Sequence, residues 1–484
     1  MSAAPDAAVQ CPPMLSPGGV RSNFLFLVSG EAVNKLTRFA AALLFARALT
    51  PAEFGDLNVA IALSGILLLA VNFGLSELGA RDVALEPARA SVTAGQVLGL
   101  RLATLTVAGL PALGLTLAVW SGREGLAVLA YVMSAVMTVS ADWIARGLGA
   151  MSRVAIATGM GGAVVAAGAV LLTVTGGSPT GAMAWFVAGE LTTAALLWMF
   201  VARIGRPAIT LAGVRALAKR ASPLAVSSFV IYTYTANLDT IIIAATRSSR
   251  EAGLYSAGYR VVLALSAVGT LAAYALLPRM AGRVRAGEGA AGMRRMLAGA
   301  MAPLATLGVA IMAAAVLAGR PLLGLLFGSE YETVGPTFVL LTAGLAWYIT
   351  TYPAAYALVA LGRNASYMRG ALAAGLAGLG LDLALIPPFG SIGAGAASAT
   401  AFVLAAAVWT WHLGLLTEEP LRRYLPSLGA VGVGSFVAIL ALIDESLRVP
   451  AFVVLASMVL AMSASAVLDI RRLVLGRSAG DLGP

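Results

Sequence analysis

The first long apolar run of the sequence carries three charged side chains on one helical face. Glu31, Lys35 and Arg38 are separated by four and three residues, and Asn34 lies beside them. A charge inside an apolar run is costly unless it meets water or an opposite charge. We therefore expect this face to line a polar cavity. The structural alternative is an internal Glu31–Lys35 pair that only tethers helices.

Further charged residues lie within later apolar runs. Asp239 and Glu190 have no cation beside them in the sequence, and deep carboxylates of this kind can bind a proton or a sodium ion. Arg260 is a deep cation that we expect to join the polar face of the first run, with an Asp239–Arg260 pair as the alternative. Asp382 is another acid within such a run.

Three other charged residues lie near the ends of their runs. Long side chains can reach water from such positions while their stems stay in an apolar environment. We therefore expect structural rather than functional roles for Glu77, Arg101 and Asp142.

An aromatic stripe occupies a later run. Tyr348, Tyr352 and Tyr356 follow one another at intervals of four residues, beside Trp347, and Pro353 interrupts the stripe. Aromatic rings with hydroxyl groups can stack on sugars and bond to them. We predict that Tyr348 and Tyr352 contact a substrate, with packing between helices as the alternative.

The elements that must position these residues are membrane-spanning helices. Hydrophobic residues make up 60% of the 484 residues and charged residues 11%, whereas a soluble domain carries about 25% charge. Runs of about 20 apolar residues match the thickness of a bilayer. Because every backbone amide needs an internal partner there, the runs should be helices. The net charge of +10 lies in islands between the runs, so it does not indicate nucleic acid.

The runs and the basic residues give the topology. The connections on the side of the N-terminus hold 22 Lys and Arg residues and the opposite connections hold six, so both termini should be cytoplasmic. The sequence predicts an all-α polytopic membrane protein with about fourteen spans, at about 24–48, 56–79, 97–120, 124–146, 153–176, 181–203, 222–246, 251–278, 295–318, 335–360, 366–388, 391–414, 425–444 and 449–469.

Two pairs of similar turns indicate an internal repeat. Glu53-Phe-Gly55 joins spans one and two as Glu251-Ala-Gly253 joins spans seven and eight, and glycine-rich hairpins at 177–181 and 390–395 form the second pair. Two six-helix lobes should then be related by a pseudo-two-fold axis along the membrane normal. We predict a disordered tail at 1–20, lobes at 21–203 and 222–417, a basic linker at 204–221, two additional spans at 418–470 and a tail at 471–484.

Motifs along most of the chain resemble those of one family. The stretch 46–55 followed by Asn72-Phe-Gly74-Leu75 is similar to the opening of the polysaccharide-transporter flippases, the Wzx-like exporters. Their superfamily also contains multidrug extruders and lipid II flippases. The resemblance covers residues 20 to 415 and continues through Asn237-Leu-Asp239, Gly253-Leu-Tyr255, Leu277-Pro278-Arg279, the stretch 326–331, Ala360-Leu-Gly362-Arg363 and the stretch 386–394.

The resemblance implies a transporter of the bacterial inner membrane that flips a lipid-linked oligosaccharide by alternating access, for export of surface polysaccharide. Its substrate would carry a pyrophosphate between undecaprenyl and sugar, and the Lys35–Arg38 face suits that anion. Binding of a proton or sodium at Asp239 and Glu190 would couple transport to an ion gradient. A polysaccharide polymerase and export machinery would be its partners.

Three alternatives remain open at this stage. A cation-coupled multidrug extruder should have an acidic cavity, which the set Lys35, Arg38 and Arg260 disfavours. A lipid II flippase shares the fourteen spans, although no arginine lies deep in the second span here. A membrane glycosyltransferase should carry a large hydrophilic loop, and none separates these runs. No nucleotide-binding or metal-binding motif is present, so we expect neither an enzyme nor a cofactor.

Overall fold

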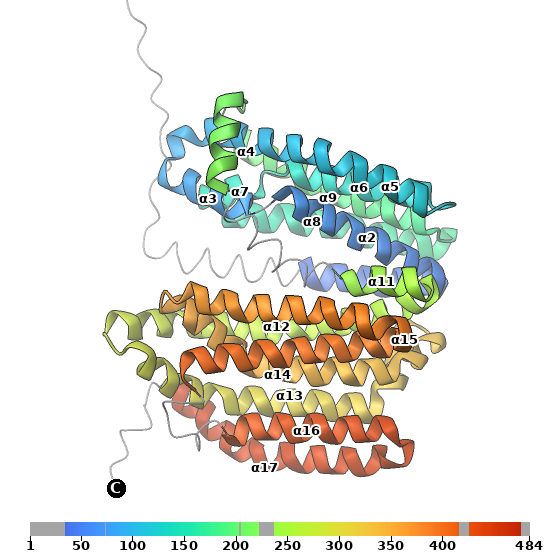
Figure 1. The fold of residues 1–484 in the computed structure, drawn as a ribbon, viewed down its shortest axis with the longest axis vertical. Coiled ribbons are helices and arrows are strands. Elements are labelled where there is room, and N and C mark those ends of the chain that lie inside the picture. The colour runs from blue at the N-terminus through green and yellow to red at the C-terminus, as the bar shows by residue number, and fades with distance from the viewer. Residues whose placement is uncertain (1–33, 73, 203–204, 222–236, 416–424, 476–484) are drawn as a thin grey trace, which may run out of the picture. The chain divides into compact units, whose positions relative to one another are not determined.

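The structure of the protein is a computed structural model that describes residues 34–72, 74–202, 205–221, 237–415 and 425–475 (Figure 1). Within these ranges the regular elements are helices, which confirms the all-α prediction. Eleven helices of the described part are long and apolar enough to cross a membrane. One of them, α15, covers two predicted spans, and spans one and seven are described only in part.

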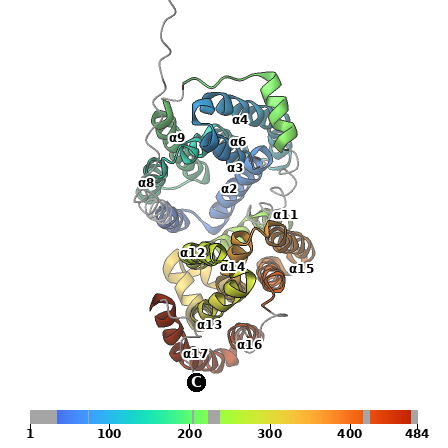
Figure 2. The same cartoon turned by 90° about the vertical axis from the view of Figure 1, so that its left-hand side faces the viewer.

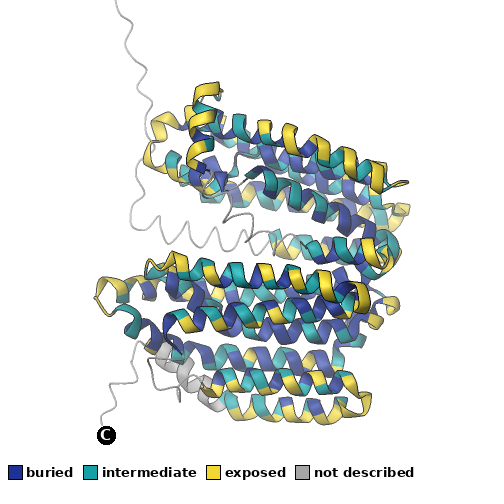
Figure 3. Cartoon of the chain, in the orientation of Figure 1, coloured by how far each residue is buried: buried dark blue, intermediate teal, exposed yellow. Residues whose placement is uncertain are grey.

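Exposed residues recur along the helices (Figure 3), and many of them are large and apolar. Val107, Val119 and Leu460 are each more than 70% exposed. Such a surface is unfavourable in water but suits acyl chains. The distribution of apolar residues therefore supports a membrane-embedded protein.

The chain forms two compact units, and the first comprises residues 1–49 and 59–232. Its core surrounds Trp143 and Ile144, which are fully buried against Leu75 and Val97. Besides a helix over residues 34–48, its elements are α2 (Pro51–Asn72, whose first residues belong to the second unit), α3 (Leu75–Leu85), η1 (Pro87–Arg89), α4 (Ala90–Thr104), the π-helical turn η2 (Leu105–Gly109), α5 (Leu110–Val119), α6 (Glu124–Val139), α7 (Asp142–Gly147), α8 (Met151–Thr175) and α9 (Pro179–Val201).

Two spans of the first unit are broken. Gly74 has φ 75°, a conformation that favours glycine, and separates α2 from α3. Ser140 is extended, with ψ 142°, and separates α6 from α7. Each break leaves backbone carbonyls without their helical partners, and these need other donors.

The second unit comprises residues 50–58 and 233–484. Helix α14 packs on α12, α13 and α15, and the last two helices pack on α13 (Figure 2). Its elements are α11 (Leu238–Thr246), α12 (Ser249–Arg285), α13 (Gly289–Phe327), η4 (Ser329–Val334), α14 (Gly335–Ala360), α15 (Asn364–Leu413), α16 (Leu425–Ile443), η6 (Glu445–Leu447) and α17 (Arg448–Leu475).

The long helix α15 contains the turn predicted between spans eleven and twelve. Gly390 interrupts it with φ 57° and ψ −134°. At Gly393 a Cβ atom would lie 2.2 Å from the carbonyl oxygen of Leu385, so the chain folds back on itself there. Glycine is thus required at both positions of this hairpin.

The two long basic connections predicted from the sequence differ from the observed ones. Helices α12 and α13 extend through most of 279–294 and leave only residues 286–288 between them. Glu288 forms ion pairs with Arg283 and Arg295 at this turn. The connection 204–221 contains a helix over residues 211–221, in which Val214 lies close to Gly99 of α4, and Ala208 just before this helix lies close to Gly95. Apolar runs indicate the length that crosses the membrane, whereas a charged helix end can continue in water.

The two turns paired as repeats meet each other in the second unit. A Cβ atom on Gly55 would lie 1.8 Å from the carbonyl oxygen of Ser249, and one on Gly253 would lie 1.9 Å from that of Pro51. Neither distance is sterically possible. The first turns of α2 and α12 therefore cross with their backbones in contact.

Replacing Gly55 by alanine should lower the melting temperature of the detergent-solubilised protein. The added methyl group must push the two backbones apart, and overpacking of this kind costs about 1–3 kcal/mol. Gly65→Ala is the matched control, because a Cβ atom at that position of α2 would meet no atom within 4 Å. Equal melting temperatures for the two variants would contradict the close crossing.

Candidate functional site

Arg38 is held by two side chains of the first unit. Its Nε donates to Oδ1 of Asn34 at 3.0 Å, and its NH2 group lies 2.6 Å from Oε1 of Glu190 on α9. The side chains of Arg38 and Glu190 are 27% and 12% exposed. Glu190 is therefore not the isolated acid that the sequence indicates, because a residue 152 positions away supplies its cation.

The other residues of the predicted polar face are described only in part. Lys35 is exposed and lies one turn before Arg38, while Asn34 is half-buried close to Gly162 of α8. Glu31 lies outside the described residues. The described part of the face thus presents a cation at Lys35 and an ion pair at Arg38.

Arg260 on α12 contacts the beginning of α2. Its Nε donates to Oδ1 of Asn58 at 3.2 Å, and its guanidinium carbon lies 5.8 Å from the centre of the Phe54 ring. Phe54 directly precedes Gly55 in the glycine crossing, and Asn58 lies three residues after it. The position of Arg260 therefore depends on that crossing.

Asp239 binds its own neighbours rather than Arg260. The Thr240 amide donates to Oδ1 of Asp239 at 2.7 Å, and the Tyr255 hydroxyl donates to Oδ2. Asp239 is 7% exposed. The predicted alternative, an Asp239–Arg260 pair, is not what the structure shows.

A small pocket joins Asp239 to a second acid. Its free volume is about 20 Å³, enough for one water molecule or ion, and Asp382, Tyr259 and Ser398 also line it. One oxygen of Asp382 is buried without a hydrogen-bond partner. Two carboxylates with hydroxyl groups are ligands for a hard cation. The described residues hold no group of three or more acids, histidines or cysteines that would indicate a transition-metal site.

The sequence places Asp382 within a span but gives it no partner. Asp239 and Asp382 are far apart in the chain, and only the packing of α11 against α15 brings them together. The one sign of this site in the sequence is that Asp382 is a charged residue within an apolar run.

The tyrosines of the aromatic stripe on α14 pack against one another and against α15. The rings of Tyr348 and Tyr352 stack with centroids 4.4 Å apart, and each ring also contacts an aromatic side chain of α15, Phe402 and Trp409 respectively. Both tyrosines are half-buried. These contacts favour helix packing, the alternative to sugar binding.

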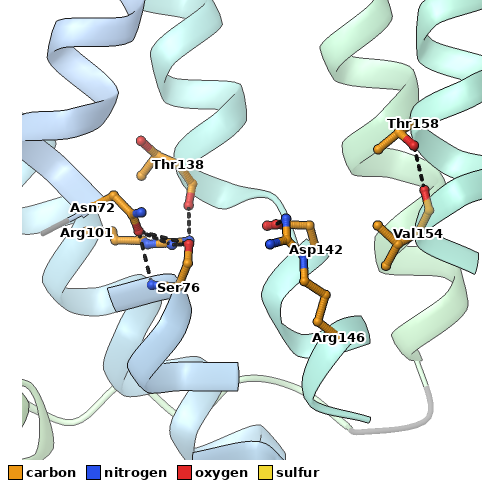
Figure 4. Close-up of polar contacts among 8 residues, drawn as sticks. All are labelled: Asn72, Ser76, Arg101, Thr138, Asp142, Arg146, Val154 and Thr158. Atoms are coloured by element: carbon orange, nitrogen blue, oxygen red, sulfur yellow. Dashed lines mark hydrogen bonds and ion pairs between the residues drawn. The ribbon is translucent and has the colours of Figure 1, made fainter. Parts of the chain in front are cut away.

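A buried arginine joins the two broken spans of the first unit (Figure 4). Arg101 is 3% exposed and donates to Oγ of Ser76 at 2.7 Å, to the Thr138 carbonyl at 3.2 Å and to Oδ1 of Asn72. Its guanidinium also lies 5.8 Å from the centre of the Trp143 ring. The expectation that Arg101 reaches water from a helix end is wrong, whereas a structural role agrees with these contacts.

The breaks explain why an arginine can be buried there. The helix ends at Val139, so the carbonyl groups of residues 138 and 139 lose their helical donors. Arg101 supplies a donor for the first, and Nε1 of Trp198 supplies one for the second at 2.8 Å. Side chains from two other spans therefore satisfy the broken helix.

Replacing Arg101 by methionine should destabilise the protein by about 2 kcal/mol or more, because it leaves buried acceptors unpaired. The exposed Arg89→Met variant loses only a surface pair with Glu86 and should melt close to the parent. Melting of the purified proteins measures the difference. Equal melting temperatures for the two variants would contradict this structural role of Arg101.

Solved structures of known proteins share this fold. The chain is similar to the lipid II flippase MurJ in an inward closed conformation, with a TM-score of 0.65 and 13% identity over 90% of this chain and 98% of that one. It is also similar to an inward-facing multidrug resistance MATE family transporter of the MOP superfamily, with a TM-score of 0.57 and 15% identity over 78% and 93%. The chain therefore has the fold of these two structures.

The family follows from the sequence itself. The polysaccharide biosynthesis protein family matches residues 20–282, more than half of the chain, and the protein belongs to it. No curated protein matches the sequence. The chain is thus a member of the polysaccharide biosynthesis protein family, which the sequence motifs predict, and it shares the fold of known membrane proteins.

Proposed function

We propose that the protein flips a lipid-linked oligosaccharide, linked through pyrophosphate to undecaprenyl, across the bacterial inner membrane by alternating access. The family supports a substrate from polysaccharide synthesis. The observation that carries the proposal is the Arg38 guanidinium, which Glu190 holds in an ion pair, with Lys35 one turn away. A pyrophosphate accepts several charge-assisted hydrogen bonds, which a planar guanidinium donates well.

In this mechanism the substrate exchanges partners with Glu190. Arg38 is bound to one carboxylate before the substrate arrives. A pyrophosphate carries more charge and more acceptor oxygens, so it displaces Glu190 from the guanidinium. The released carboxylate, only 12% exposed, would then be available to a coupling cation. Substrate binding at Arg38 would in this way be linked to ion binding at Glu190.

The pocket of Asp239 and Asp382 is our second candidate for ion coupling. Two carboxylates and the Ser398 hydroxyl would bind a sodium ion or, alternatively, one proton shared between the acids. The pocket adjoins α11 and α15, whose packing a bound cation would stabilise. The sequence predicts ion coupling at Asp239, and the lining of the pocket leads us to include Asp382.

The orientation rests on charge. The excess of Lys and Arg in the connections on the N-terminal side supports cytoplasmic termini. An oligosaccharide exporter in this orientation would deliver its substrate to a polysaccharide polymerase and export machinery. In the same scheme Arg260 contributes to substrate binding, and Tyr348 and Tyr352 offer half-buried hydroxyl groups to the sugars.

A lipid II flippase is the second candidate, because the similarity in fold to MurJ favours it. Lipid II also carries a pyrophosphate, so the cationic face alone does not separate the two substrates. Helix α2 contains no arginine or lysine, which distinguishes this chain from the cationic pattern expected of lipid II flippases. A multidrug extruder is disfavoured by the cations at Lys35 and Arg260.

The double variant Lys35→Ala, Arg38→Ala should abolish export of surface polysaccharide while the protein still inserts in the membrane. The change removes both cations from the face that would bind the pyrophosphate. Polysaccharide on intact cells and the protein in isolated membranes are measured together, with Arg47→Ala as the control. Normal surface polysaccharide in the double variant would refute the cationic site.

Neutralising the acid pocket should remove the ion dependence of the protein. We expect a coupling cation to raise the melting temperature, because a ligand that binds only the folded state stabilises it. Sodium is compared with potassium at constant ionic strength, and a pH series tests for a proton. The Asp382→Asn and Asp239→Asn variants should lose the shift, whereas Asp444→Asn in an exposed turn should keep it. An unchanged shift in both pocket variants would exclude this site.

A further inference from the structure

A second pocket lies in the second unit, where α13, α14, α16 and α17 meet. Its free volume is about 50 Å³. Most of its lining is apolar, including Pro321, Val339 and Leu442, and the ionisable side chains among the lining residues are Arg320 and Arg448. Two guanidinium groups in an otherwise apolar pocket require an explanation, because charge is costly in such surroundings.

One carboxylate outside the pocket holds both arginines. The NH2 groups of Arg320 and Arg448 each lie 2.7 Å from Oε1 of Glu445. Glu445 is 66% exposed and does not line the pocket. Asp444, the other acid of this turn, accepts a bond from the Ser446 amide at 2.8 Å. One carboxylate between two guanidiniums leaves a positive charge beside the pocket.

Arg320 has a buried donor that remains unsatisfied. Its Nε is inaccessible and has no hydrogen-bond partner. A buried donor without an acceptor is destabilising. An anion in the pocket would supply that acceptor.

The absence of a side chain at Gly335 leaves the space that Arg320 occupies. At Gly335, the first residue of α14, a Cβ atom would lie 2.3 Å from Cγ of Arg320. Any side chain there would displace the arginine. The first turn of α14 also turns the positive end of its helix dipole toward this region.

The surface around the pocket is strongly apolar. Ile443 at the end of α16 is 77% exposed, Val449 of α17 is 62% exposed and Leu317 of α13 is 47% exposed. In a membrane protein such side chains face acyl chains. A ligand that fits both features has an anionic head and an apolar tail.

We propose that this pocket binds the phosphate headgroup of a membrane phospholipid. The phosphate oxygens accept bonds from Arg320 and Arg448, and the acyl chains lie along the exposed apolar side chains. Guanidinium groups donate charge-assisted hydrogen bonds to phosphate oxygens. The site would anchor α16 and α17 to the bilayer, and it is independent of the substrate proposed above.

Native mass spectrometry of the full chain released from phosphatidylglycerol nanodiscs tests the proposal. The parent should retain one phosphatidylglycerol that resists removal. The Arg320→Gln, Arg448→Gln variant should bind it at least about tenfold more weakly, since charge-assisted bonds are lost. Arg250→Gln is the matched control, because that arginine of the same unit pairs with Glu330 away from the pocket and should leave retention unchanged.

Two further arms make the result decisive. Gly335→Ala keeps every charge but displaces Arg320, and it should weaken retention as well. Inorganic phosphate should not displace the lipid, because it lacks the acyl chains. Equal lipid retention in the parent, the double arginine variant and Gly335→Ala would overturn the proposal. Displacement by millimolar phosphate would also overturn it, in favour of a site for free anions.

Discussion

The contact between the backbones at Gly55 and Gly253 is the constraint that fixes the position of Arg260, the predicted cationic residue of the second unit. Because no side chain separates the first turns of α2 and α12, Phe54 and Asn58 reach Arg260, which lies about two turns beyond Gly253 in α12. The same start of α12 carries Glu251, whose carboxylate accepts a bond from the Ser391 amide at 2.7 Å. One close approach thus positions parts of α2, α12 and α15.

Deep charges in this protein are stabilised by local partners. Arg38 pairs with Glu190, Arg101 satisfies the acceptors of broken helices, and Asp239 accepts bonds from its neighbours. Each arrangement offsets the cost of burying charge. A substrate or ion that binds at such a site must replace the existing partner, so binding and rearrangement become linked.

The sequence predicts the fold better than the site. Apolar runs locate the spans, and the glycine-rich turn at Gly390 marks the break within α15. The sequence does not reveal that Arg38 meets Glu190, or that Asp239 shares a pocket with Asp382, because those contacts depend on how distant helices pack. The prediction that Arg101 reaches water is wrong for the same reason. Two nearby helix breaks create the acceptors that allow this arginine to be buried.

Recognition of a pyrophosphate is central to the transport of a lipid-linked sugar that we propose. The most direct test is translocation in vesicles reconstituted with the purified protein. The same oligosaccharide is attached to undecaprenyl through a pyrophosphate or through a neutral linker. We predict that the pyrophosphate-linked substrate changes leaflet and the neutral one does not. Equal rates for the two substrates would contradict the account.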